Sequence, residues 1–322
     1  MSRVSNSIVL GIDGGGTHTR AVIAHGGKIL SQAKGGSIKR LRVGPEAAEA
    51  NLRMLLREVF HVAGVSRIDA ASAGVASASM PGVKEWITDV FHDFGVRESE
   101  VVGDEVIALD AAFEGGAGIL QIAGTGSNCI GRMASGERES VGGYSSVLGD
   151  EGSGYWIGLH GIRQALRAYD AGEPSTILDR VGVEWGTSTL EELVNLGNST
   201  ANLGNGVPGP DFSALAPIIS AAAEEGDAVA TRVLHQAAAD LAEFILLVRH
   251  KLRQRHGLTE EVPAAFTGGV LEKMGIVRAR LTDLLKQAAP QMPFRQEGVV
   301  AVEGALWRAR KLAEMRSPLS AD

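Results

Sequence analysis

The sequence predicts an α/β protein that contains two copies of one domain. In each copy a β-type run leads through a glycine-rich turn into a second β-type run, first at residues 14–16 and again at residues 124–126. The next turns contain Gly26 and Gly136, each 12 residues after the glycine that begins the first turn. Because matched internal spacing indicates a duplicated structural unit, we expect two similar domains that face each other across one cleft.

The composition is that of a globular protein with enough residues for two hydrophobic cores. The chain has 322 residues, of which 44% are hydrophobic and 21% are charged. A net charge of -7 argues against a nucleic-acid partner, because there is no basic excess to neutralise phosphates. No apolar run approaches the ~20 residues that span a bilayer, and the first residues lack the apolar stretch of a signal peptide. We therefore expect a cytoplasmic protein with no membrane partner.

The first copy predicts three strands followed by alternating helices and strands. Apolar residues at helical spacing, among them Leu52, Leu55 and Val59, indicate a helix from about Pro45. In chain order we expect three antiparallel strands within residues 8–33, a basic loop at 34–42, the helix from Pro45, a strand at 70–76, a helix at 84–94, a short strand that ends at 102, and a helix from Glu105.

The second copy begins with the same hairpin and continues with more helix. Its loop at residues 142–158 is rich in glycine, serine and acidic residues, and either Asp150 or Ser153 is expected to cap the helix that follows. In chain order we expect strands at 118–123 and 128–133, a helix from Tyr155, mainly helix at 159–225 with a surface loop at 195–210, a long helix at 227–255, a strand at 263–266, and a helix at 297–311.

The first glycine turn has the residue types of a phosphate-binding hairpin. Glycines leave no side chain between the backbone and a ligand, so the N–H groups of Gly15 and Gly16 can approach an anion closely. Thr17 adds a hydroxyl donor, and Asp13 is placed to hold a hydrated Mg²⁺ ion. An ordinary glycine-rich hairpin turn is the alternative interpretation.

Asp104 is a second chemical candidate, because it follows a short strand and precedes a helix. A carboxylate at a strand end can accept the proton of a substrate hydroxyl, as phosphoryl transfer to an alcohol requires. The alternative is that Asp104 only caps the helix. His18 is expected to be a surface residue or to support the site residues from behind, and the other histidines show no metal-ligand spacing.

Five segments follow one another along the chain, namely DGGGT, VVGDEVIALDAAFEG, IAGTGSN, GGY…GDEGSGYWIG and FTGGV. With these segments the chain resembles the actin-like ATPase and sugar kinase superfamily, and within it the N-acetylglucosamine kinases and the BadF/BadG/BcrA/BcrD ATPases. The resemblance implies two ribonuclease-H-like domains around a central cleft, at residues 1–116 and 117–299. It also implies that the last helix, at about 300–322, packs back on the first domain, and that the protein is a homodimer.

The resemblance also implies roles for individual residues. Asp104 would be the general base and Asp13 would contact Mg²⁺. The phosphates of ATP would contact Gly15, Gly16, Thr17 and Thr125, and the adenosine would contact Gly268 and Gly269. The sugar would contact Ser127, Asn128, Gly143, Tyr144 and Asp150.

The chain departs from the kinase pattern in the loop after the third strand. Lys39 stands where the kinases place an asparagine that grips the sugar. A hypothesis follows, in which Lys39 or Arg40 contacts an acidic substituent such as the lactyl carboxylate of N-acetylmuramic acid. The alternative is that both are solvated loop residues.

The prediction is an ATP-dependent kinase of an amino sugar, foremost of N-acetylglucosamine at its 6-hydroxyl. N-acetylmuramic acid and glucosamine are the alternative substrates. A dehydratase activator of the same family would need two cysteines per subunit for its iron–sulfur cluster, whereas this chain has only Cys129. A sugar-responsive repressor would need a DNA-binding segment before the first strand, which begins at about Ile8. A nucleotide switch of the actin or chaperone kind is the remaining alternative.

Overall fold

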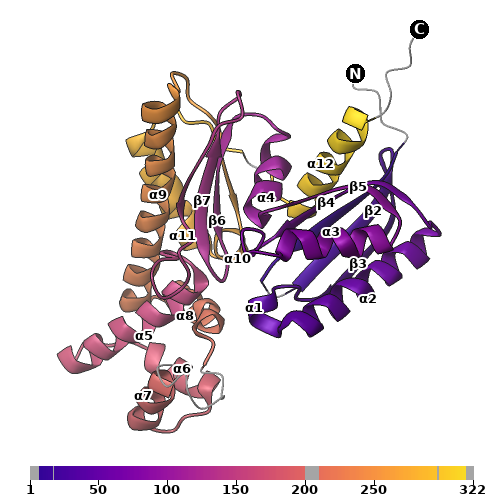
Figure 1. Ribbon diagram of the computed structural model, residues 1–322. Helices are drawn as coiled ribbons and strands as arrows, with labels where there is room; N and C mark the ends of the chain where they lie inside the picture. The colour runs from indigo at the N-terminus through magenta and orange to yellow at the C-terminus, as the bar shows by residue number, and fades with distance from the viewer. Residues whose placement is uncertain (1–6, 17, 200–209, 296, 317–322) are drawn as a thin grey trace. The chain divides into compact units, whose positions relative to one another are not determined.

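The computed structural model describes residues 7–16, 18–199, 210–295 and 297–316, and the chain divides into two compact units (Figure 1). Unit 1 is Met1–Gly116 with Val299–Asp322, and unit 2 is Ala117–Gly298. The elements of unit 1 are β1 (Ile8–Gly14), β2 (His18–His25), β3 (Lys28–Gly36), α1 (Arg40–Val43), α2 (Pro45–Ala63), β4 (Ile68–Val75), α3 (Val83–Asp93), β5 (Val96–Val102), α4 (Asp104–Phe113) and α12 (Ala301–Arg316).

Unit 2 contains the remaining elements. They are β6 (Gly118–Ala123), β7 (Ser127–Arg132), β8 (Arg138–Gly142), α5 (Gly154–Ala171), α6 (Ile177–Trp185), α7 (Leu190–Asn198), the 3₁₀ helix η2 (Phe212–Leu215), α8 (Ala216–Glu224), α9 (Ala228–His256), β9 (Ala264–Thr267), α10 (Gly269–Lys273) and α11 (Gly275–Ala288).

The sheet of unit 1 has the strand order β3-β2-β1-β4-β5. Strands β1, β2 and β3 form an antiparallel meander, whereas β4 and β5 run parallel to β1. In this register Asp13 lies opposite Arg20 of β2 and opposite Gly74 of β4. The carboxyl ends of β1, β4 and β5 therefore lie along one edge of the sheet, which is where parallel α/β sheets place their ligands.

Helices cover both faces of this sheet (Figure 1). Helices α2 and α3 pack on one face with Leu10 and Ile12 of β1 in the buried cluster beneath them. Helices α4 and α12 pack on the other face, where Val9 meets Leu306 of α12 in a separate cluster. Successive side chains of a strand point to opposite faces, so a strand covered on both faces carries an unbroken run without charged residues, as residues 8–12 of β1 do.

The sheet of unit 2 has the strand order β8-β7-β6-β9. Strands β6, β7 and β8 are antiparallel neighbours, and β9 runs parallel to β6. The order and directions are those of β3-β2-β1-β4 in unit 1. The matched glycine spacing thus corresponds to two hairpins at equivalent places in two similar sheets.

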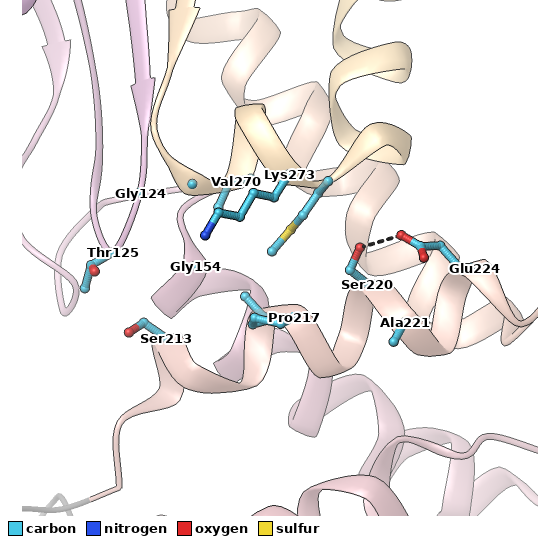
Figure 2. Close-up of a pocket in the computed structure, with 13 residues that line it drawn as sticks. Gly124, Thr125, Gly154, Ser213, Pro217, Ser220, Ala221, Glu224, Val270 and Lys273 are labelled. Carbon is cyan, nitrogen blue, oxygen red and sulfur yellow. Dashed lines mark hydrogen bonds between the residues drawn. The ribbon is translucent and has the colours of Figure 1, made fainter. Parts of the chain in front are cut away.

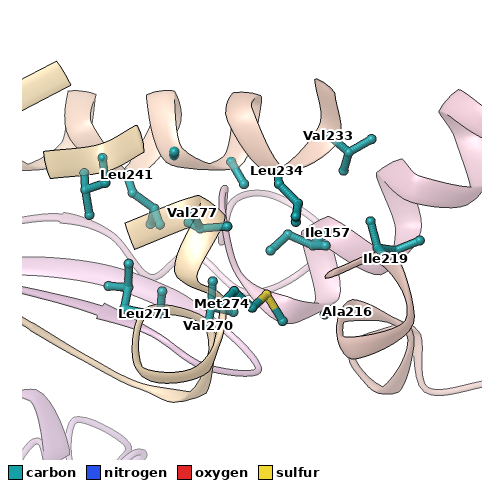
Figure 3. Packing of buried hydrophobic residues seen from close by; sticks show 14 of the residues in the cluster. Ile157, Ala216, Ile219, Val233, Leu234, Leu241, Val270, Leu271, Met274 and Val277 are labelled. Atoms are coloured by element: carbon teal, nitrogen blue, oxygen red, sulfur yellow. The ribbon is translucent and has the colours of Figure 1, made fainter. Parts of the chain in front are cut away.

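The core of unit 2 is built mainly by helices (Figure 3). Helix α9 packs along β6, β7 and β8, and α5, α8 and α11 pack against α9. Ile157 of α5, Leu234 of α9 and Val277 of α11 are fully buried in this cluster. A core shared by several helices gives the cavity described below rigid walls.

Most of the predicted elements are confirmed, and the differences are local. The predicted basic loop is wrong at both ends, because Lys34 belongs to β3 and Arg40–Val43 forms the short helix α1. The predicted surface loop begins too early, since α7 continues to Asn198, and its residues 200–209 lie outside the described residues. Ser153, not Asp150, caps α5, with its hydroxyl accepting from the N–H of Trp156 at 3.1 Å. Among the described helices, none is both long and apolar enough to cross a membrane.

Candidate functional site

The first glycine turn joins β1 to β2 and is open in front of its backbone. A Cβ atom added at Gly16 would meet no atom within 4 Å, and one at Gly15 would meet only the carbonyl of His18, at 3.6 Å. At Gly14, by contrast, a Cβ would lie 2.8 Å from Ile38. Packing therefore explains Gly14 but not the next two glycines, whose bare backbone leaves room for a ligand. Thr17, the predicted hydroxyl donor, lies outside the described residues.

Asp13 is the second-last residue of β1 and is half-buried beside this turn. Burial raises the pKa of its carboxyl, and the charge of Arg20 opposes that shift. A partly desolvated carboxylate has a strong tendency to acquire a cation or a proton.

Asp104 is the first residue of α4 and lies directly after β5. The cap position is held by Gly103, so the alternative that Asp104 caps the helix is wrong. Its Oδ1 accepts a hydrogen bond from the N–H of Glu105 at 3.1 Å. Burial, the charge of Glu105, a side-chain hydrogen bond with Glu105 and the charge of Asp13 raise the pKa of Asp104 to about 7, against the opposing effect of the backbone N–H bond. A carboxylate with a pKa near neutrality is suited to accept and release a proton at physiological pH.

Asp13 is the residue of this edge that is predicted to hold a metal ion. The described residues contain no group of three or more histidine, cysteine, aspartate or glutamate side chains that could hold one. Asp13 and Asp104 nevertheless lie close enough for one charge to shift the pKa of the other. Mg²⁺ commonly binds through one or two carboxylates and completes its shell with water and substrate phosphates. The carboxylate of Asp13 therefore fits a Mg²⁺ ion that takes its other ligands from water and phosphates.

The segment after β3 is tied to the first turn by Ser37. Its hydroxyl donates to the carbonyl of Gly16 at 3.0 Å and accepts from the N–H of Lys39 at 3.1 Å. The side-chain amide of Asn51 donates to the carbonyl of Ser37 at 2.8 Å. Lys39 is thus held next to the turn, and its ammonium group forms no hydrogen bond or ion pair with any residue that the structure describes.

Arg40, the other basic candidate of this segment, has a structural contact. Its guanidinium lies over the ring of Trp86, 4.1 Å from the ring centroid. Such a contact stabilises α1 against α3 and occupies the face of the guanidinium. Of the two predicted basic residues, only Lys39 has a side chain without such a contact.

In unit 2 the predicted sugar-binding residues lie around the β6–β7 turn. The carboxylate of Asp150 contacts Gly126, where an added Cβ would lie 2.8 Å from Oδ2. Asp150 is buried and has a φ of 60°, in the left-handed region that non-glycine residues seldom adopt. A buried carboxylate on strained backbone is frequent at functional sites.

Ser127, Asn128 and Gly143 join this turn to the strand ends. The hydroxyl of Ser127 donates to the carbonyl of Glu151 at 2.6 Å, and the N–H of Gly143 donates to the carbonyl of Ser127 at 3.0 Å. The side-chain oxygen of Asn128 is buried and accepts no hydrogen bond from the described residues. A buried acceptor of this kind is costly unless a ligand or water satisfies it.

Tyr144 lies in the loop after β8, and its side chain is 69% exposed. Val147 and Leu148 of the same loop are also exposed. The loop is therefore attached at Gly143 and Asp150 and presents apolar side chains to solvent between these two points.

A cavity of about 490 Å³ lies beside the β6–β7 turn (Figure 2). This volume suits a small-molecule ligand. Two of the predicted residues, Thr125 and Gly269, line this cavity. Its lining residues come from the turn, α5, η2, α8 and α10, and are Gly124, Thr125, Gly154, Ser213, Ala216, Pro217, Ser220, Ala221, Glu224, Gly269, Val270, Lys273 and Met274.

Gly268 does not line this cavity but shapes one wall of it. Its φ is 98°, and an added Cβ would lie 2.4 Å from the carbonyl oxygen of Ala123. Only glycine fits between the end of β9 and the end of β6. The N–H of Gly268 donates to Glu272 at 3.0 Å, which fixes the start of α10.

Sequence reasoning missed the residues that α8 and α10 contribute. Ser220 and Glu224 line the cavity from α8, and Lys273 lines it from α10. The sequence of a short helix shows the spacing of its apolar residues. It does not show which of its polar residues face a cavity. The nearness of Lys273 to the glycine pair was the one signal that could have drawn attention to it.

The family model described as the BadF/BadG/BcrA/BcrD ATPase family matches residues 10–308. An N-acetylmuramic acid/N-acetylglucosamine kinase from Clostridium acetobutylicum is 29% identical, covering 88% of this chain and 92% of the relative. An N-acetyl-D-glucosamine kinase from Dictyostelium discoideum is 30% identical, covering 88% and 90%. The glucosamine kinase GspK from Vibrio cholerae is 29% identical, covering 94% and 95%.

Among solved structures, a candidate N-acetylglucosamine kinase from Chromobacterium violaceum superimposes with a TM-score of 0.71. It is 24% identical in sequence, and the match covers 93% of this chain and 98% of that one. The likeness confirms the predicted α/β fold, in a chain that divides into two compact units.

Proposed function

Because the chain belongs to the BadF/BadG/BcrA/BcrD ATPase family, we propose that it is an ATP-dependent amino-sugar kinase. The reaction is transfer of the γ-phosphoryl group to the 6-hydroxyl of N-acetylglucosamine. The observation that carries this proposal is the position and pKa of Asp104, a carboxylate that titrates near pH 7 at the strand edge that also holds Asp13. The names of the curated relatives support an amino sugar as the acceptor.

Asp104 has the role of general base. As the 6-hydroxyl attacks phosphorus, its proton passes to the carboxylate of Asp104, and the bond between the γ-phosphorus and the bridging oxygen of ATP breaks. Glu105 supports this role, because its negative charge and its side-chain hydrogen bond raise the pKa of Asp104. An Asp104 with an ordinary pKa would be a weaker acceptor for a hydroxyl proton.

The phosphates of ATP are assigned to the backbone of Gly15 and Gly16 and to Thr125. A Cβ at Gly16 would meet no atom within 4 Å and one at Gly15 only a single atom, so the turn leaves room for a ligand, and Thr125 is an exposed residue that lines the cavity. Asp13 is the residue assigned to Mg²⁺, which neutralises phosphate charge when it is bound. The adenosine is assigned to the cavity at Gly269, with Gly268 shaping its wall.

The sugar is assigned to the cluster at the β6–β7 turn. Asp150 can accept hydrogen bonds from sugar hydroxyls, and the unsatisfied oxygen of Asn128 can accept another. Ser127 and Gly143 hold these groups in place through backbone contacts, and Tyr144 offers an exposed ring.

The test is consumption of ATP with N-acetylglucosamine, glucosamine, N-acetylmuramic acid, glucose or no sugar. We expect strong stimulation by an amino sugar and loss of that stimulation in Asp104→Ala. The matched control is Asp89→Ala, which removes an exposed carboxylate of α3 in the same unit. ATP consumption that is unchanged by every sugar would overturn the kinase proposal in favour of a nucleotide switch.

A second candidate acceptor is N-acetylmuramic acid, which carries a carboxylate that N-acetylglucosamine lacks. The observation that favours it is Lys39, whose backbone N–H is held near the first turn and whose ammonium has no partner among the described residues. A charge-assisted hydrogen bond from Lys39 would favour the acidic sugar. Arg40 is no longer an equal candidate, because it lies over Trp86.

Kinetics of Lys39→Ala on both sugars decide between these acceptors. If Lys39 contacts the lactyl carboxylate, kcat/KM for N-acetylmuramic acid falls by about tenfold or more, and the value for N-acetylglucosamine changes little. Equal losses on both sugars, or no loss on either, would exclude this role. Lys34→Ala, in β3, is the matched control because it removes an exposed lysine of the same unit.

A further inference from the structure

The cavity of unit 2 has opposite charges at its two ends (Figure 2). Lys273 extends from α10 with its ammonium toward the end where Thr125 lies. Glu224 lies at the other end, on α8. Pro217 lies between them, and the apolar residues Val270 and Met274 also line the cavity. A ligand that fills this cavity is therefore expected to have an anionic end and a flat or apolar middle.

The length of helix α8 indicates how far the cavity extends from the β6–β7 turn. A Cβ added at Gly154 would lie 3.2 Å from the carbonyl oxygen of Gly124, in the β6–β7 turn, and 3.6 Å from the carbonyl oxygen of Ser213. Ser213, which lies just before α8, is therefore close to this turn. At 1.5 Å per residue, Ser220 lies about 10 Å farther along the helix and Glu224 about 16 Å. If the turn holds phosphates, these two side chains meet the part of the nucleotide farthest from the phosphates, which is the base.

Ser220 and Glu224 form a hydrogen-bonded pair at this end. The hydroxyl of Ser220 donates to Oε1 of Glu224 at 3.2 Å, and Ser220 is buried (Figure 2). The next residue, Glu225, has a different partner, since it forms an ion pair with Arg180 and does not line the cavity. Glu224 thus keeps an acceptor oxygen for a ligand, held by a serine on the same helix face.

We infer that Ser220 and Glu224 read the nucleotide base and favour a base with an amino group at its outer edge. This inference rests on the proposed function in one respect, namely that the ligand of the cavity is a nucleoside triphosphate. Adenine presents its 6-amino group as a donor, which a carboxylate accepts. Hypoxanthine presents a carbonyl oxygen at the same position, and two acceptors cannot satisfy each other. Glu224 therefore selects for ATP by an attractive contact with adenine and a repulsive one with a 6-keto base.

Binding of ATP and ITP, each as its magnesium complex and without sugar, tests the inference. The two nucleotides share ribose and triphosphate and differ only at the base. The ratio of their Kd values therefore measures how strongly the protein distinguishes the two bases. Titration calorimetry is expected to give about tenfold or tighter binding of ATP by the wild-type protein. In Glu224→Gln the ratio is expected to fall toward one, because an amide offers a donor as well as an acceptor.

Two further variants complete the design. Glu225→Gln is the matched control, because it removes the neighbouring carboxylate outside the cavity and should keep the wild-type ratio. Ser220→Ala leaves Glu224 in place but removes the hydroxyl that orients it, so the ratio should fall part of the way. Melting temperatures of all variants establish that each is folded before its ratio is interpreted.

The outcomes separate this inference from the kinase proposal. Equal binding of ATP and ITP by the wild-type protein, or a wild-type ratio in Glu224→Gln, overturns the inference even if sugar-dependent ATP consumption is found. Absence of binding of both nucleotides overturns it as well. A base preference that depends on Glu224, together with no stimulation by any sugar, supports the inference and overturns the kinase proposal alone.

Discussion

Gly126 lies directly against the carboxylate of Asp150, so closely that a Cβ atom at Gly126 would be 2.8 Å from Oδ2. This contact joins the β6–β7 turn to the loop before α5. Asp150 also has a φ of 60°, which its surroundings must maintain. The position of a proposed sugar-binding carboxylate thus depends on the absence of one side chain.

Gly126→Ala is therefore expected to displace Asp150 and to lower kcat/KM for the sugar. A displacement near 1 Å at a positioning group can cost about 10²-fold in rate. The control is Gly275→Ala, at the start of α11, where an added Cβ meets no atom within 4 Å. Steady-state kinetics measure the effect, and wild-type kinetics in Gly126→Ala would contradict the proposed role of Asp150.

The pH dependence of activity follows from the pKa of Asp104. A general base must be deprotonated, and the carboxyl has a pKa of about 7. We expect kcat/KM, which reports the free enzyme, to rise about tenfold per pH unit below pH 7 and to level off above it. Glu105→Gln removes a cause of the raised pKa, so its profile should shift to lower pH. An unchanged midpoint in this variant would mean that another group controls the profile.

The same pKa predicts how stability changes with pH. Asp104 binds its proton more tightly in the folded protein than at its ordinary pKa of 3.8, so folding is favoured by protonation and becomes less favourable as pH rises from about 4 to 7. An asparagine side chain cannot ionise. Asp104→Asn should therefore be more stable than wild type by about 1–3 kcal/mol at pH 8, with the difference vanishing near pH 4. Urea unfolding at pH 4, 6 and 8 measures it, and a pH-independent difference would contradict the assigned pKa.

Arg308 of α12 holds two carboxylates of unit 1 together. Its guanidinium bonds both oxygens of Glu100, at 2.6 and 2.8 Å, and Oδ2 of Asp110, at 2.8 Å. Burial alone would lower the pKa of Arg308, but the bonds to Glu100 and Asp110 outweigh it and raise that pKa. The side chain of Asp110 is fully buried, so the guanidinium offsets the cost of burying its charge.

Arg308→Met is expected to lower the free energy of unfolding by about 3–5 kcal/mol, because it removes the cation that is paired with a fully buried carboxylate. Lys311→Met, one turn along the same helix, removes only an exposed ion pair with Glu314 and should cost less than about 1 kcal/mol. Urea unfolding of both variants provides the comparison. Similar decreases in the free energy of unfolding of the two variants would show that the buried ion pair stabilises the protein no more than the exposed one.

The strands, most helices and the two hairpins could be predicted because their signals are local. Glycine turns, alternation and helical spacing lie within a few residues of each other, as around Gly14–Gly16 and Gly124–Gly126. The capping alternative for Asp104 illustrates the limit. Whether Gly103 or Asp104 is the cap depends on one residue at a helix boundary, where sequence patterns are least informative.

The sequence by itself determined the α/β architecture, the duplicated hairpin and the family, since these follow from the order of residues along the chain. Only the tertiary structure decided which polar residues act together. Arg308 pairs with Asp110 across 198 residues, and Ser220 and Glu224 share a cavity with Lys273. Likewise, the pKa of Asp104 depends on Asp13, far away in sequence. Burial and charge act through distances in space, which no local pattern of residues contains.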